Sequence, residues 1–219
     1  MTSPRVGVVG TGAWARHLHI PAAASSDRVT FTAVLGRDPH RTEGAVLGTT
    51  ARALCDLTPF LEAVDIVVIA VSPASQPPLA LAAMRAGKNV LLEKPIALDA
   101  GQAQMLAASA ETGGLRTVVF LPHRLAPELH TWSSRARATG GWRLGTVEAW
   151  SSVLVDPTGR FHDSPWRHER GALWDVGPHA IAQLTAVLGP VAGVTAQRGP
   201  GDLTTLVLQH ENGAVSYTH

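Results

Sequence analysis

The stretch Arg5-Val-Gly-Val-Val-Gly10-Thr-Gly12-Ala-Trp-Ala15 decides the fold of this chain. Its apolar run from Val6 to Val9 predicts a short buried strand that ends at Gly10. A helix is expected to follow from about Ala13 to Ala24. A strand that leads through a Gly-x-Gly-x-x-Gly/Ala turn into a helix is typical of a dinucleotide-binding βαβ unit, although the turn alone is a weak signal.

Each position of this loop has an expected physical role. Gly10 permits the tight turn, and Gly12 lets the backbone approach a pyrophosphate. Ala15 replaces the third glycine and keeps the helix close to the strand. Ala13 and Trp14 open the helix, whose free N–H groups and positive dipole end attract phosphate. These five residues are candidate cofactor ligands, and the alternative interpretation is a plain strand-to-helix turn.

Strands and helices alternate over residues 1–121. Further strands are expected at Val29–Leu35, Ile66–Val71, Val90–Leu92 and Thr117–Leu121. Helices are expected from Pro39, from Pro77 to Gly87, and from the cap Asp99 to Thr112. This alternation predicts an α/β Rossmann domain, a doubly wound parallel sheet with helices on both faces.

The pattern changes over residues 122–219. Helices are expected near Pro127–Ala138 and Trp174–Leu188, and strands at Trp142–Val155, Val191–Gln197, Leu203–His210 and Ala214–Tyr217. Asn212-Gly213 predicts a hairpin between the last two strands. We expect a smaller α+β domain for substrate and oligomerisation, with an open antiparallel sheet that is shortened at the carboxyl end. Its exposed edge favours a homodimer or homotetramer through this sheet.

Composition excludes several classes of protein. The net charge is +1, so no electrostatic field favours nucleic acid, and no apolar stretch approaches the length of a membrane span. The single cysteine, Cys55, and the absence of a signal-peptide pattern predict a cytoplasmic protein. The ten histidines show no metal-ligand spacing, so no metal site is expected. The expected partner is a small-molecule substrate.

The end of the second strand, Leu35-Gly36-Arg37-Asp38, bears on the cofactor. An NAD site usually places Asp or Glu there to bind the ribose hydroxyls. Gly36 leaves room instead, and Arg37 could pair with a 2′-phosphate, with Arg41 adding charge. NADP(H) is therefore favoured over NAD(H). The alternative is an NAD site in which Asp38 binds the ribose and Arg37 is a solvated surface residue.

Later motifs resemble one known family. Glu93-Lys94-Pro95 at a strand end resembles the Gfo/Idh/MocA oxidoreductases, the family of glucose–fructose oxidoreductase and inositol dehydrogenase. Val71-Ser72-Pro73 is similar to the family's Thr-Pro loop along the cofactor, and Arg124 to an arginine near the nicotinamide. Asp175-Val-Gly-Pro-His179 resembles the family's Asp-x-Gly-x-x-His substrate motif with one spacer fewer.

The resemblance implies roles for these residues. Lys94 and His179 would handle the proton that accompanies hydride transfer, and Asp175 would position the substrate. Lys94 could instead be a surface lysine, Asp175 a helix-terminal residue favoured by the dipole, and His179 a structural histidine. Trp166 and Arg167 could cover the substrate or anchor their loop.

Three functions remain open from the sequence. The first is an NADP(H)-dependent oxidoreductase acting on a hydroxyl or carbonyl carbon of a sugar, cyclitol or related small metabolite. The second is a non-catalytic NADP(H)-binding sensor or scaffold, favoured by Ala182, where the family often has Asp, and by the short carboxyl end. The third is reduction of a double bond in a substrate that is not a sugar.

Overall fold

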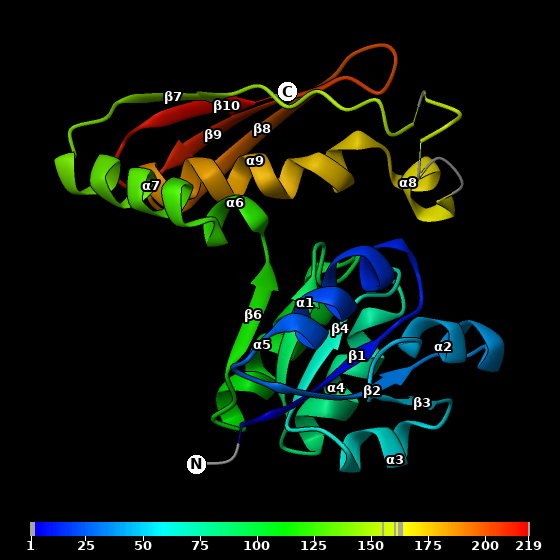
Figure 1. Ribbon diagram of the computed structural model, residues 1–219. Helices are drawn as coiled ribbons and strands as arrows, with labels where there is room; N and C mark the ends of the chain where they lie inside the picture. Colours follow the sequence, from blue (N-terminus) through cyan, green and yellow to red (C-terminus); the bar gives the residue numbers. More distant parts are fainter. Residues whose placement is uncertain (1–2, 155, 160, 162–163, 219) are drawn as a thin grey trace. The chain divides into compact units, whose positions relative to one another are not determined.

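The computed structural model describes residues 3–154, 156–159, 161 and 164–218 (Figure 1). The contacts between residues divide the chain into two compact units, Met1–Phe120 and Leu121–His219. No helix within the described ranges is long and apolar enough to span a membrane.

A six-stranded parallel sheet forms the centre of the first unit and confirms the predicted doubly wound α/β fold. Its strands lie in the order β3-β2-β1-β4-β5-β6. They are β1 (Arg5–Val9), β2 (Thr30–Leu35), β3 (Arg52–Leu54), β4 (Ile66–Ile69), β5 (Asn89–Glu93) and β6 (Thr117–Phe120). The strand order reverses between β1 and β4, and open α/β sheets bind ligands beyond the carboxyl ends of the strands at such a point.

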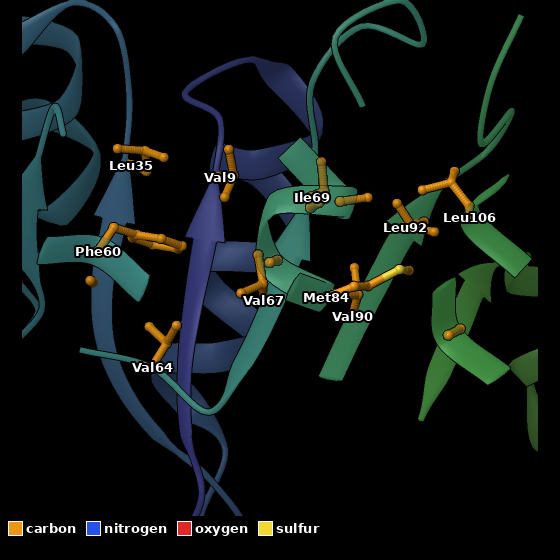
Figure 2. Close-up of a cluster of buried hydrophobic side chains, with 14 residues drawn as sticks. Val9, Leu35, Phe60, Val64, Val67, Ile69, Met84, Val90, Leu92 and Leu106 are labelled. Atoms are coloured by element: carbon orange, nitrogen blue, oxygen red, sulfur yellow. The ribbon is translucent and has the colours of Figure 1, made fainter. Parts of the chain in front are cut away.

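Helices cover both faces of this sheet. They are η1 (Ala15–His19), α1 (Ile20–Ser25), α2 (Pro39–Val46), α3 (Leu57–Glu62), α4 (Gln76–Arg85) and α5 (Ala100–Thr112). One face packs against α3, α4 and α5, and Figure 2 shows Phe60, Met84 and Leu106 from these helices in one cluster with the strand residues Leu35, Val67 and Leu92. A second cluster covers the other face. Burial on both faces explains why these strands are continuous apolar runs.

An ion pair joins two strands at the opposite edge of the sheet. Arg5, at the start of β1, places its Nη2 2.7 Å from Oδ1 of Asp65, the residue before β4. The hydrogen bonds from the Arg5 side chain and backbone lower the pKa of Asp65 to about 2. Because both side chains are about half exposed, solvent screens the ion pair and it adds little to the stability of the fold. Its main effect is to align the start of β1 with the start of β4.

Four short elements were not expected from the sequence: β3, α3, α6 (Pro122–Leu125) and α8 (Pro165–Arg170), each too short to show a hydrophobic period. One predicted helix also has an unexpected turn. The predicted helix Ala13–Ala24 is present as η1 followed by α1, so its first part is a π-turn. Such turns are rare and occur often at functional sites.

The second unit packs one long helix on a four-stranded sheet. Its helices are α6 (Pro122–Leu125), α7 (Pro127–Thr139), α8 (Pro165–Arg170) and the long helix α9 (Ala172–Leu188). Its strands are β7 (Leu144–Val147), β8 (Val191–Arg198), β9 (Thr204–His210) and β10 (Val215–Thr218), in the order β7-β10-β9-β8. Leu184 and Leu188 of α9 pack on Leu206 and Leu208 of β9.

Two expectations for this unit need correction. The sheet is mixed, because β7 pairs in parallel with β10, whereas β8, β9 and β10 are antiparallel as predicted. The long strand expected at Trp142–Val155 is only Leu144–Val147, and Val155 lies outside the described residues. The reason is that β7 has ladder partners only along the four residues of β10. The hairpin predicted at Asn212-Gly213 joins β9 to β10.

Candidate cofactor and substrate sites

Gly10 is required by the packing of three strand ends. Its φ is +121°, and its N–H donates a 2.8 Å hydrogen bond to the Leu35 carbonyl at the end of β2. A Cβ at this position would collide with the Ala70 carbonyl oxygen just after β4. Glycine alone therefore permits this turn.

Gly12 has no such packing constraint. A Cβ built on Gly12 meets no heavy atom within 4 Å, so the fold itself does not need glycine there. The residue is exposed, while Ala15 is fully buried and holds the helix against the sheet. Ala13 and the partly exposed Trp14 form the start of the helix. Open space in front of a helix start fits a pyrophosphate, so this loop fits the predicted dinucleotide.

The residues after β2 explain the missing carboxylate. A Cβ on Gly36 would collide with Oγ1 of Thr42 and the methyl group of Thr11, so an acidic side chain has no room there. The Asp38 carboxylate instead caps α2 by accepting a 3.1 Å hydrogen bond from the Arg41 N–H. The Arg41 side chain donates through Nη2 to the Thr11 carbonyl at 3.3 Å. Arg41 therefore contacts the glycine loop, and Arg37, four positions earlier in the chain, is exposed.

The other cofactor candidates of the first unit follow the neighbouring strands. Val71, Ser72 and the buried Pro73 form a turn after β4, closed by a 2.9 Å hydrogen bond from the Ser75 N–H to the Ser72 carbonyl. Glu93, Lys94 and Pro95 stand at the end of β5. The sheet therefore brings all of the predicted first-unit cofactor residues to the carboxyl ends of β1, β2, β4 and β5.

Glu93 and Lys94 differ in their surroundings. The Glu93 side chain is buried, and its Oε1 lies 2.7 Å from Nε2 of His19 in η1. Lys94 is half-buried. The buried carboxamide of Gln76 donates hydrogen bonds to the carbonyls of Glu93 and Pro95 at 2.9 and 2.8 Å. The Glu93 carboxylate is therefore held inside the fold by His19.

In the second unit, Asp175 is paired rather than free. Nε of Arg167 lies 3.1 Å from Oδ2 of Asp175, and both side chains are buried. The Arg167 guanidinium also lies 4.7 Å from the Phe161 ring centroid and 4.5 Å from that of Trp166. Its Nη1 donates to the Ser164 hydroxyl at 3.1 Å. Arg167 thus ties α8 and the preceding loop to the start of α9.

His179 lies one turn after Asp175 on α9. Its ring packs edge-to-face on that of His123 in α6, with centroids 5.6 Å apart and an interplanar angle of 88°. Arg124, the predicted nicotinamide neighbour, is the next residue of α6 and is exposed. Ala182 is buried, so the position of the family's acidic residue faces the interior here.

The structure assigns the predicted site residues to two units. Lys94 and the first-unit cofactor candidates belong to Met1–Phe120, and Arg124, Trp166, Arg167, Asp175 and His179 to Leu121–His219. The joint action of Lys94 and His179 stays a prediction. Within the described part of the chain, no cluster of three His, Cys, Asp or Glu residues could hold a metal ion.

Sequence analysis missed His19, Gln76 and His123. The histidines as a group were tested only for metal-ligand spacing, and a buried polar residue on a helix, such as His19, has no local signal that identifies its partner. Gln76 lies 17 positions from Glu93 and 19 from Pro95 in the sequence. His123 could have been found from its position next to Arg124.

Comparison with known proteins is consistent with this arrangement. Residues 4–121 match the model of an oxidoreductase family with an NAD-binding Rossmann fold. A dTDP-3,4-didehydro-2,6-dideoxy-α-D-glucose 3-reductase of Streptomyces violaceoruber is 29% identical over 189 residues, covering 84% of this chain and 54% of the reductase. The chain spans about half the length of this and similar curated relatives.

Solved structures show the same fold. GenD2 from gentamicin A biosynthesis, in complex with NAD, has a TM-score of 0.79 and 26% identity, covering 100% of this chain and 65% of GenD2. The WlbA dehydrogenase from Bordetella pertussis, in complex with NADH and UDP-GlcNAcA, has a TM-score of 0.85 and 24% identity, covering 99% of this chain and 70% of WlbA.

Proposed function

The chain belongs to the Gfo/Idh/MocA family of oxidoreductases, and we propose that it takes part in NADP(H)-dependent hydride transfer on a nucleotide-linked sugar or a related metabolite. The observation that carries the proposal is the position of Lys94 at the carboxyl end of β5. The glycine loop, with open space at Gly12, follows the carboxyl end of β1 in the same parallel sheet. The substrate class is supported by the relative from Streptomyces violaceoruber, which is a reductase of a dTDP-linked sugar.

The residues of the chain have separate tasks in this proposal. A bound nicotinamide cofactor supplies or accepts the hydride. The Lys94 ammonium donates its proton to the oxygen of the carbonyl being reduced, and in the oxidation direction the amine accepts the hydroxyl proton. His179 and Asp175 bind the substrate hydroxyl groups, with His179 as a second proton-handling group. Arg167 acts on the substrate through Asp175, to which it is paired.

This function can be tested by incubating the purified protein with NADPH and a panel of dTDP- and UDP-linked keto sugars. We expect NADPH oxidation that depends on one of these ketones and can be followed by loss of nicotinamide absorbance. NADPH binding without NADPH oxidation by any ketone of the panel, and without NADP+ reduction by the corresponding alcohols, would contradict the proposed activity and favour a sensor or scaffold.

We further propose that the cofactor is NADP(H). Support comes from Gly36, where contacts with Thr42 and Thr11 leave no room for an acidic side chain, and from Arg37 and Arg41, two exposed cations that follow β2. Replacing Arg37 or Arg41 by alanine is expected to weaken NADPH binding about 10- to 100-fold, the usual value of a hydrogen bond to a charged group, and to leave NADH binding unchanged. Fluorescence titration of both cofactors measures the two Kd values.

Arg116→Ala is the matched control for these variants, because Arg116 is exposed at the amino end of β6, the opposite edge of the sheet. Equal losses of NADPH and NADH affinity in the Arg37 and Arg41 variants would show that neither arginine selects the 2′-phosphate.

Self-association through the second sheet is the proposed assembly. The face of this sheet opposite α9 exposes Leu144, Val207, Val215 and Tyr217, which the strand register places side by side. A contiguous apolar face of this kind supports an interface between copies of the chain.

A further inference from the structure

We infer that Gln76 is a positioning residue for Lys94: its buried carboxamide holds the backbone on both sides of the catalytic lysine. The inference rests on the proposed function, in which Lys94 handles the proton. Gln76 is the first residue of α4 and is fully buried.

The geometry of the contact is specific to a carboxamide. Nε2 of Gln76 lies 2.9 Å from the Glu93 carbonyl and 2.8 Å from the Pro95 carbonyl. A primary amide nitrogen carries two hydrogens, so this single nitrogen can serve both acceptors. The two carbonyls bracket Lys94, and the direction in which its side chain leaves the backbone is therefore set from α4.

The backbone needs this support because β5 ends at Glu93. Pro95 lies beyond the strand ladder, and a side-chain donor replaces the missing strand partner for its carbonyl. The neighbouring Glu93 side chain is held independently, by His19, whose ring packs edge-to-face on Phe120 of β6 with centroids 4.9 Å apart. Strand, helix and side-chain contacts thus fix both residues next to Lys94, while Lys94 itself is half-buried and accessible.

The chain offers a direct probe of Lys94, because it contains only two lysines. Lys88 precedes β5 and Lys94 follows it, and both are half-buried. Acetic anhydride labelling over a range of pH, quantified by mass spectrometry, reports the reactivity of the Lys94 amine relative to that of Lys88. Two variants remove the hydrogen bonds of Gln76 to different degrees. Gln76→Met fills the space without a hydrogen-bond donor, and Gln76→His keeps a single ring N–H donor.

We expect the ratio of Lys94 to Lys88 labelling to change in Gln76→Met, with a smaller change in Gln76→His and none in the exposed control Gln102→Met. With the active ketone, kcat should fall roughly 10- to 100-fold in Gln76→Met, the cost of a misplaced catalytic group, while the Kd for NADPH should change much less than kcat. Circular dichroism establishes that each variant is folded, and the histidine variant carries the test if the methionine variant is not.

An unchanged labelling profile for Lys94 in folded Gln76→Met or Gln76→His overturns the inference. Wild-type protein that turns over none of the ketones contradicts the proposed function instead, and the labelling profiles then decide the role of Gln76 by themselves.

Discussion

Lys94→Met is expected to lose about 10²- to 10⁴-fold in turnover, the usual contribution of a general acid–base group. Methionine has nearly the length of lysine but carries no exchangeable proton, so the step that fails is proton transfer to or from the substrate oxygen. NADPH affinity should fall much less than turnover, because the glycine loop and the arginines after β2 are untouched. Steady-state kinetics with the active ketone, together with fluorescence titration of NADPH, separates the two quantities.

Lys88→Met is the matched control, since it removes the only other lysine from the opposite end of the same strand. Full turnover in Lys94→Met would remove Lys94 from the chemistry. The proton for the ketone oxygen would then have to come from another group, such as His179.

Arg167→Leu is expected to destabilise the second unit by about 3–5 kcal/mol, the usual cost of removing one partner of a buried ion pair. The substitution leaves the Asp175 carboxylate buried without its guanidinium, and it also removes the cation from the Trp166 and Phe161 rings. Denaturant unfolding followed by circular dichroism measures the loss of free energy of unfolding.

Two further variants make this test selective. Arg170→Leu removes an exposed arginine of the same helix, which lies 5.5 Å from the Trp174 ring, and should cost only about 0.5–1 kcal/mol. In the double variant Arg167→Leu/Asp175→Leu, most of the lost stability should return, because no uncompensated charge remains. If Arg167→Leu is no less stable than Arg170→Leu, the ion pair is not what holds α8 to α9.

These two predictions assign different roles to residues that sequence analysis grouped as one site. Lys94 lies at a strand end, and Gln76 donates hydrogen bonds to the backbone carbonyls of the residues before and after it. A fixed backbone on both sides suits a group that transfers a proton. Asp175 is buried against Arg167, so we expect it to keep α9 and the loop before it in place, in addition to its proposed contact with the substrate.

Parts of the molecule with strong local patterns were predicted well. The strands β1, β4 and β5 are buried on both faces and appear as apolar runs, and Asp99 caps α5 as expected, accepting from the Gln102 N–H. The short elements β3 and α3 lack such patterns, since three to six residues complete no more than one or two turns or side-chain alternations.

The cofactor candidates could be predicted because a parallel sheet carries its strand ends to one edge, whatever the details of packing. The assignment of Lys94, Asp175 and His179 depended on resemblance to a family rather than on spacing. Neither the strand pattern nor the family resemblance identified His19 and Gln76. Their partners lie 74 and 17–19 positions away in the sequence, and only packing brings them together.

The sequence by itself determined the Rossmann sheet, the glycine loop and the position of Lys94 at a strand end, since each depends on residues that are neighbours in the chain. The tertiary structure decided that Gly10 is needed for packing and Gly12 is not, that an acid cannot replace Gly36, and that β7 joins its sheet in parallel. It also decided what surrounds Lys94 and Asp175. The physical reason is that burial and long-range hydrogen bonds depend on which segments contact each other in space. The local periodicity of a sequence does not specify these contacts.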